Sequence, residues 1–218
     1  MIRDSTMKMI QKAQRPAGFL LLILLAALFL SLSPADDHKV VFVYDGDTVL
    51  LEDGIRIRYV GINTPEIDRD GGAHEFMAEE ASAVNRRWVE GMSVRLEYDQ
   101  ERVDAHGRHL VYLFLSNGEM VNASLVRKGL AHVMSIPPNL KYRDLLLKCQ
   151  REAMAKGVGI WRSLSKVPET RIGNRAAYRF HRPDCLFAKR ISKKNRRRFR
   201  SRFEAFWEGY APCRRCRP

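Results

Sequence analysis

Short runs of alternating apolar and polar residues dominate the middle of this chain and predict strands. Lys39 to Leu51 is apolar and β-branched, which predicts one strand, and Ile55 to Ile62 alternates apolar residues with arginines, which predicts a second. The intervening Glu52-Asp53-Gly54 is typical of a hairpin turn. Further strands are predicted at residues 93–98, 109–115, 119–121 and 130–134.

Helical spacing is strongest in two longer segments. His74 to Glu90 and Leu140 to Lys156 repeat apolar residues at helical intervals, and a glycine follows each of them. Asn122 has the character of an N-cap for a short helix from Ala123 to Lys128. Short strands that close on themselves, together with a few helices, favour an α+β, mainly β fold such as the five-stranded oligonucleotide-binding (OB) barrel.

The first 35 residues have the pattern of a targeting segment. Basic residues precede an apolar run at residues 18–32, and Ser33-Pro34-Ala35 offers a cleavage point. This pattern predicts a signal peptide, and an uncleaved membrane anchor through residues 18–32 is the alternative. In either case we expect the folded part to lie outside the cytoplasm, either secreted or periplasmic, or anchored to the membrane.

The positive charge of the chain is concentrated at its end. Residues 171–218 carry 16 Lys or Arg and 3 Asp or Glu, a balance of +13, whereas residues 1–170 carry 22 of each. Such a basic block favours contact with nucleic acid or with an anionic membrane surface, although a solubilising tail has the same composition. We therefore predict a main domain at 38–164, a linker at 165–174 and a separate basic module at 175–218.

Three charged patterns carry the candidate chemistry: Asp45-Gly46-Asp47-Thr48, Arg58 followed by Asn63-Thr64-Pro65-Glu66, and Asp104-Ala105-His106-Gly107-Arg108. On a regular strand Asp45 and Asp47 would share one face, and their oxygens suit Ca²⁺ or Mg²⁺. Arginine can bind a phosphate with two hydrogen bonds, and a glutamate held at a strand end can act as a general base. Each pattern alone is an ordinary turn, surface arginine or helix start. Together they supply what metal-assisted cleavage of a phosphodiester requires.

Residues from about Val40 to Trp161 resemble the staphylococcal nuclease (thermonuclease) family. The shared strings are DGDT at 45–48, Arg58 with NTPE at 63–66, EAS at 80–82, D-x2-GR at 104–108, VN-x-SLV-x-K-GLA at 121–131 and a closing IW. The resemblance implies an OB barrel with three helices, and Ca²⁺-dependent hydrolysis of DNA and RNA.

The resemblance also implies roles for single residues. Glu66 would be the general base, and Arg58 and Arg108 would bind phosphate and stabilise the transition state. Asp47, Asn63 and Thr64 would bind calcium, with Thr64 acting through its backbone carbonyl. Asn63 stands where the family has an aspartate, and this lower ligand charge predicts a weaker calcium site or a preference for another divalent cation.

The basic C-terminal segment contains a second candidate metal site. His181-x3-Cys185 and Cys213-x2-Cys216 have the spacing of a tetrahedral zinc site. Disulfides or free thiols are the alternatives, but three cysteines would leave one unpaired unless it joined Cys149. Zinc uses all four residues, and a unit this small would need the metal in order to fold.

Residues Arg179 to Pro218 also resemble the zinc-binding N-terminal domain of the Ada DNA-repair protein. The shared features are the x3 pair, Asn195-x3-Phe199, Ala205 followed by Gly209-Tyr210, and Pro212-Cys213-x2-Cys216. His181 replaces a cysteine of that domain, so the resemblance implies a metal-stabilised module that holds DNA and not methyl transfer. The predicted nucleic-acid-binding residues are Lys193, Lys194, Arg196, Arg197, Arg198 and Arg200.

The sequence thus predicts an extracytoplasmic, metal-dependent nuclease that acts on DNA, RNA or both as a monomer. The alternative is an OB module that binds nucleic acid and cleaves it weakly or not at all, because Asn63 could mark a lost metal site. A third reading is an anchored interaction protein whose basic tail contacts anionic lipid.

Overall fold

The computed structural model describes residues 37–165 and 167–218. The predicted signal peptide or anchor, residues 1–35, lies outside the described residues and stays a prediction. Among the residues that are described, no helix is both long enough and apolar enough to cross a bilayer.

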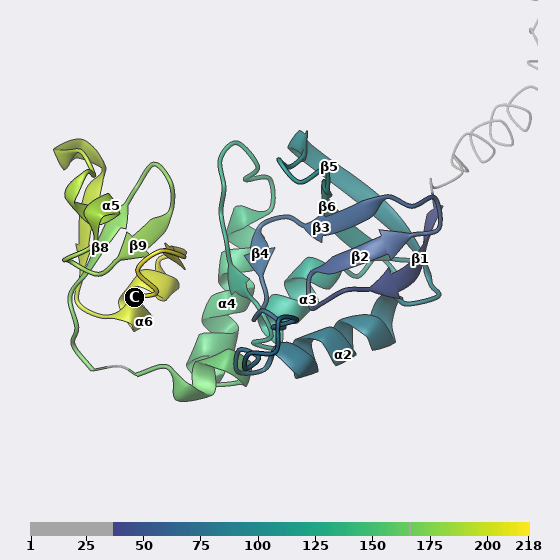
Figure 1. Cartoon of the computed structure of the whole chain (residues 1–218), viewed down its shortest axis with the longest axis horizontal. Helices are drawn as coiled ribbons and strands as arrows, with labels where there is room; N and C mark the ends of the chain where they lie inside the picture. Colours follow the sequence, from purple (N-terminus) through teal and green to yellow (C-terminus); the bar gives the residue numbers. More distant parts are fainter. Residues whose placement is uncertain (1–36, 166) are drawn as a thin grey trace, which may run out of the picture. The chain divides into compact units, whose positions relative to one another are not determined.

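Five strands within residues 37–165 close into a barrel in the order β1-β2-β3-β6-β5 (Figure 1). Neighbouring strands are antiparallel except β3 and β6, which are parallel. Their alternating side chains fill the interior, where Val40, Ile57, Val111 and Leu113 are fully buried. The predicted OB barrel is therefore confirmed. The barrel strands are β1 Asp37–Val43, β2 Thr48–Leu51, β3 Arg56–Tyr59, β5 Ser93–Val103 and β6 His109–Leu115.

The first predicted strand is wrong in one important respect. Residues 39–51 do not form one strand, because the chain turns at residues 44–47 and the two halves pair as the hairpin of β1 and β2. Asp45 and Asp47 therefore lie in a turn and do not share the face of a strand. The short β4 (Ile62–Asn63) pairs with β7 (His132–Val133) beside the barrel.

Three helices complete the main domain, as the resemblance implied: α2 Ala78–Val89, α3 Val121–Arg127 and α4 Arg143–Lys156. The first begins later than the predicted start at His74, and Phe76, within the predicted range, is exposed before the helix starts. Gly157 ends α4 in the left-handed conformation, which glycine adopts without strain. The 3-10 helix η1 (Gly159–Ser163) follows.

Asn122 is not a helix cap, because α3 already begins at Val121. Its side chain is fully buried; it donates to the carbonyls of Val60 and Val111 and accepts a hydrogen bond from the amide of Leu113. It therefore connects the helix to strand β6 and to the residue that follows β3. A polar residue at this position in the sequence does not reveal that its side chain is buried.

The C-terminal residues form a small sheet in the order β10-β8-β9-β11. Its strands are β8 Arg171–Asn174, β9 Arg179–His181, β10 Arg196–Phe199 and β11 Ala211–Pro212, and its helices are α5 Leu186–Lys189, η2 Lys193–Asn195 and α6 Arg202–Trp207. Residues 171–174, expected in the linker, thus form a strand of this module. We refer to residues 171–218 as the C-terminal module.

The module packs on α4 through a shared core. Phe206 of α6 makes edge-to-face contacts with Trp161, at 5.1 Å between ring centroids, and with His132, at 5.6 Å. The buried Gln150 side chain accepts a hydrogen bond from the amide of Val133 and donates one to the carbonyl of Phe206. Residues 36–218 consequently form one compact unit.

Replacing Asn122 with alanine should lower the free energy of unfolding by about 3 kcal/mol, because three hydrogen bonds to the buried backbone of Val60, Val111 and Leu113 are lost. Urea unfolding followed by tryptophan fluorescence measures this change. Asn117→Ala, in an exposed turn where the side chain accepts one hydrogen bond from Glu119, serves as the control and should cost about 1 kcal/mol or less. Equal costs for both variants would contradict the structural role of Asn122.

Candidate functional site

The turn between β1 and β2 places the first candidate residue. The amide of Asp47 donates to the Asp45 carboxylate, with 3.0 Å between the nitrogen and Oδ1. The turn lies against Thr64, and a β-carbon at Gly46 would come within 2.7 Å of the Thr64 side chain. Only glycine lets the two segments approach this closely, so the turn and the loop after β4 are held together.

Asp47 is the centre of a buried polar network. Its Oδ2 atom lies 2.5 Å from Arg58 Nη1 and accepts a hydrogen bond from the amide of Thr64 at 2.8 Å. Asp47 and Arg58 are each only 5% exposed. Because buried charges need close partners, this pair joins the turn, strand β3 and the loop after β4 into one rigid unit.

Asn63 fits this network as an amide. Its Oδ1 accepts from Arg58 Nη2 at 2.9 Å, while its Nδ2 donates to the carbonyl of Thr64 at 2.9 Å. A carboxylate here could accept from Arg58 but would face the Thr64 carbonyl without a proton to donate. The residue that departs from the family pattern thus takes part in the network through both ends of its side-chain amide.

Two nearby carboxyl groups, those of Asp45 and Glu66, have pKa values that are raised by burial and by the charge of Asp47. Burial and the charge of Asp47 raise the pKa of Asp45 to about 6. Enclosure of its carboxyl group and the charge of Asp47 also raise the pKa of Glu66, while Arg58 and Arg214 act in the opposite direction. A glutamate with a raised pKa beside a cationic group is suited to proton transfer.

The oxygens near Asp47 fit a divalent cation of the calcium or magnesium type. They are the carboxylates of Asp45 and Asp47, the amide of Asn63 and the carbonyl of Thr64, all hard donors. After burial, the Asp47 charge is the next cause of the raised pKa of Asp45, and Arg58 offsets it only in part. A bound cation would supply further compensation.

The structure does not bring Arg108 into hydrogen-bond contact with these residues. It lies in the turn between β5 and β6, where its side chain pairs with Asp104 at 2.7 and 2.9 Å. Within the described residues, the Arg108 side chain is thus paired with Asp104 of the same turn. To bind a phosphate, the Arg108 guanidinium would have to contact both the phosphate and Asp104.

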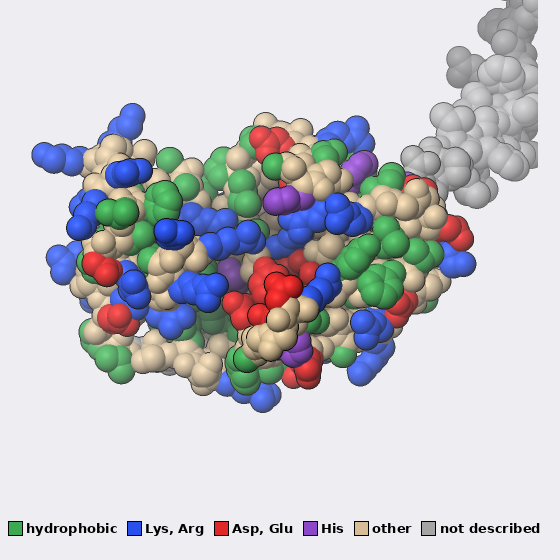
Figure 2. All heavy atoms as spheres, in the orientation of Figure 1, with side chains coloured by type: hydrophobic (Ala, Val, Ile, Leu, Met, Phe, Trp, Pro, Cys, Tyr) green, Lys and Arg blue, Asp and Glu red, His purple; other side chains and the backbone are tan. Residues whose placement is uncertain are grey.

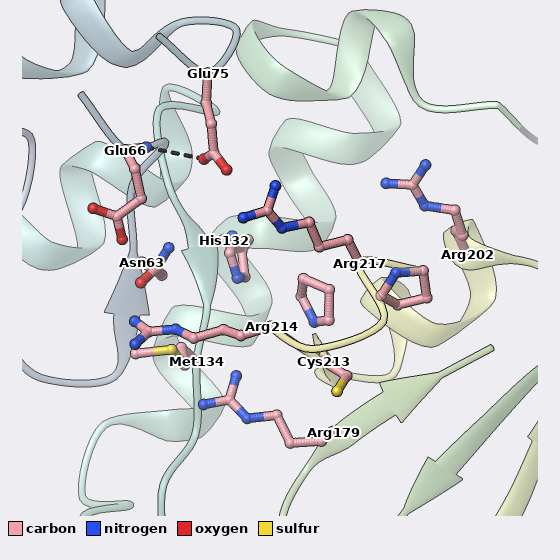
Figure 3. Close-up of a pocket in the computed structure, with 12 residues that line it drawn as sticks. Asn63, Glu66, Glu75, His132, Met134, Arg179, Arg202, Cys213, Arg214 and Arg217 are labelled. Atoms are coloured by element: carbon pink, nitrogen blue, oxygen red, sulfur yellow. Dashed lines mark hydrogen bonds between the residues drawn. The ribbon is translucent and has the colours of Figure 1, made fainter. Parts of the chain in front are cut away.

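The Glu66 side chain lines a cleft of about 460 Å³ between the main domain and the C-terminal module (Figures 2 and 3). One wall carries Asn63, Glu66, Glu75, His132 and Met134. The opposite wall consists of module residues, namely Arg179, Arg202, Pro212, Cys213, Arg214, Arg217 and Pro218. On the face in Figure 2, acidic side chains gather near the centre with basic side chains on both sides.

Sequence reasoning missed the arginines of this cleft. Arg179, Arg214 and Arg217 lie far from the catalytic patterns along the chain, and their only signal was the charge of the C-terminal block. His132 was also missed, and burial together with Arg179 lowers its pKa to about 3, so it is neutral here.

The residues of the second candidate metal site converge as their spacing predicted. The ligand atoms of His181, Cys185, Cys213 and Cys216 all lie within 4.8 Å of one another, and all four residues are buried. The three cysteines, like Cys149, are free thiols and form no disulfide. This cluster can hold a metal ion with a closed shell of nitrogen and sulfur.

The predicted nucleic-acid-binding residues lie on η2, β10 and the residue after it, away from the cleft lining. Several are engaged inside the module: Arg196 donates to the carbonyl of Ala188, and Arg197 pairs with Glu208 at 3.2 Å. Arg198 donates to Thr170, and Arg200 lies 3.6 Å from Glu204. Lys193 and Lys194 have no ion pair with any described residue.

Comparisons with known proteins agree with the barrel fold. A family model described as "Staphylococcal nuclease homologue" matches residues 56–163. The chain is similar to the thermonuclease of Staphylococcus intermedius, with 38% identity over 129 residues that cover 58% of this chain and 76% of the relative. It is also similar to the thermonuclease of Staphylococcus hyicus, with 35% identity over 127 residues, 57% of this chain and 75% of the relative.

A more distant relative is endonuclease YncB of Bacillus subtilis, which is 33% identical over 122 residues, 54% of this chain and 57% of the relative. The family match ends at residue 163, so the C-terminal module lies beyond it. The match includes Arg58, Asn63, Thr64, Glu66 and Arg108. This chain belongs to the staphylococcal nuclease family.

Proposed function

We propose that this nuclease is an extracytoplasmic enzyme that hydrolyses phosphodiester bonds of DNA, RNA or both with the help of a divalent cation, preferably Ca²⁺. One observation carries the proposal. The Glu66 side chain lines an open cleft together with Asn63, and Asn63 accepts a hydrogen bond from Arg58, so a base, a candidate cation ligand and an arginine lie close together.

In the proposed reaction, Glu66 removes a proton from a water molecule that attacks the phosphorus atom. Arg58 and Arg108 stabilise the negative charge that builds on the phosphoryl oxygens. Asp47, Asn63 and the Thr64 carbonyl would hold the cation, which supplies further charge neutralisation when bound. The buried Asp47 and Arg58 pair keeps these groups in place before substrate arrives.

We further propose that the cluster of His181, Cys185, Cys213 and Cys216 binds zinc, and that the C-terminal module resembles the Ada-type zinc-binding domain in function as a nucleic-acid-binding unit. The convergence of four buried ligand atoms and the absence of a disulfide between the described cysteines support zinc. Lys193 and Lys194, with the neighbouring arginines, stay candidates for peripheral contacts to DNA.

Glu66→Gln should lower the rate of cleavage by about 100-fold or more, because the amide cannot accept the proton of water. The measurement is cleavage of labelled single-stranded DNA and RNA by protein lacking residues 1–35. Glu80→Gln, which removes an exposed carboxylate from α2, should retain full activity. Equal activity of the wild type and Glu66→Gln would remove Glu66 from the reaction, and no cleavage by the wild type at any calcium concentration would favour the binding-module alternative.

Asn63→Asp should lower the calcium concentration for half-maximal activity by about tenfold, because the site gains a charged ligand. Without calcium the variant should be less stable than the wild type, since the new carboxylate faces the Thr64 carbonyl. Cleavage assays over a range of calcium concentrations measure the first effect, and thermal unfolding with and without calcium measures the second. The buffer should contain no chelator so that zinc is retained. If calcium raises the Tm of Asn63→Asp by no more than it raises the Tm of the control Asn117→Asp, Asn63 is not part of the cation site.

Purified protein should contain about one equivalent of zinc per chain, and Cys213→Ser should lose it and destabilise the C-terminal module. Elemental analysis measures the zinc content. Cys149→Ser is the matched control, because that buried cysteine lies on α4 outside the cluster and its replacement should leave zinc bound. Zinc-free protein with a disulfide between the module cysteines would contradict the metal site.

A further inference from the structure

The cleft has a basic wall that the catalytic residues do not explain. Figure 3 shows Arg214, Arg217 and Arg179 extending from the C-terminal module toward the wall that carries Asn63 and Glu66. Within the described residues, none of the three arginine side chains forms an ion pair. By contrast, Arg197 and Arg171 of the same module each pair with a glutamate.

Clustering these like charges is unfavourable without an anion. Arg179 is half-buried and lines the same cleft as Arg214. Arg214 lines the cleft on the wall opposite Glu66. The lining has four arginines and two glutamates, so the cleft has an excess of positive charge that a polyanion would neutralise.

Backbone contacts determine the positions of Arg214 and Arg217. Arg214 and Arg215 lie between two residues of the metal cluster, Cys213 and Cys216. The amide of Cys213 donates to the carbonyl of Phe180 at 2.9 Å, and the amide of Arg217 donates to the carbonyl of Cys213 at 3.0 Å. Arg217 also has a φ of 41°, a conformation that residues with a side chain rarely adopt.

The module as a whole is held against the main domain. Arg151 of α4 donates to the carbonyl of Trp207 at 2.8 Å, and the Arg143 guanidinium lies 4.5 Å from the centre of the Tyr178 ring. These contacts add to the shared core around Phe206. The arginines therefore face Glu66 across a cleft with two fixed walls, and not from the end of a flexible tail.

We propose that Arg214, Arg217 and Arg179 bind the phosphates of a single-stranded nucleic acid beside the bond that is cleaved, so that the C-terminal module forms half of the active-site cleft. The inference rests on the proposed function for the chemistry of the ligand. Guanidinium groups bind phosphates with paired hydrogen bonds, and a cleft of about 460 Å³ suits a segment of one strand. The metal cluster then has a role in the reaction, because it holds the loop that carries Arg214.

The test measures binding separately from cleavage. All variants carry Glu66→Gln, and a fluorescent single strand of about 12 nucleotides, as DNA or as RNA, is titrated in calcium-free buffer with zinc retained. Arg214→Gln and Arg217→Gln should each raise Kd about tenfold, and the slope of log Kd against log salt should fall by about 0.7 for each phosphate that the variant no longer binds. Arg214→Lys should recover the salt slope because it keeps the charge.

Arg215→Gln is the matched control. Arg215 is exposed, carries the same charge and lies in the same loop, but it does not line the cleft. It should change Kd by less than about twofold. Zinc content and circular dichroism of each variant show that the module remains folded.

Cleavage by the wild-type chain, measured in parallel, separates the two proposals. If the wild type cleaves but Arg214→Gln and Arg217→Gln bind no more weakly than Arg215→Gln, the basic wall is not a phosphate site and this inference fails alone. If the wild type does not cleave but the binding differences appear as predicted, the proposed reaction fails and the basic wall stands.

Discussion

The candidate site depends on one buried carboxylate. Asp47 contacts Arg58 through an ion pair and Thr64 through a backbone amide, and so joins a turn, a strand and a loop that are separate in the sequence. Removing either partner of such a buried pair typically costs about 3–5 kcal/mol, because the other charge is left without compensation. The same contacts that stabilise this end of the barrel therefore prepare the groups that we assign to chemistry.

A second constraint is the joint between α4 and the C-terminal module. Gln150 uses both ends of its side-chain amide here, one toward the main domain at Val133 and one toward the module at Phe206. Because this joint is buried and hydrogen-bonded, the module cannot be treated as a tail that delivers nucleic acid from a distance. The thiol and imidazole cluster, the basic loop and the cleft form one continuous structure, although they come from different parts of the chain.

The sequence predicts the barrel well because strand alternation and turn residues are local signals. The sequence wrongly predicts Asn122 as a helix cap and misses the turn at residues 44–47. Both errors arise because the deciding contacts are made in the folded chain. Asn122 is polar but buried, and one of its hydrogen bonds reaches Val60, which is 62 residues away along the chain. The turn interrupts an apolar run whose composition fits a single strand, and only pairing between its two halves reveals the hairpin.

Residue type and spacing predict the cluster of His181 and the three cysteines, but they do not predict the basic wall of the cleft. His181, Cys185, Cys213 and Cys216 converge as predicted because their types and separations are specific. The cleft arginines could not be predicted, since charge along a basic segment does not tell which side chains face solvent, which pair with glutamates and which face Glu66. Arg197 forms an ion pair with Glu208, whereas Arg214 lines the cleft.

The most direct test of the account is a crystal structure of the Glu66→Gln protein with calcium, zinc and a bound single-stranded oligonucleotide. The account predicts one phosphate between residue 66 and Arg58, calcium at Asp47, and flanking phosphates within hydrogen-bond distance of Arg214 and Arg217. A strand bound along Lys193 to Arg200, with no phosphate in the cleft, would contradict it.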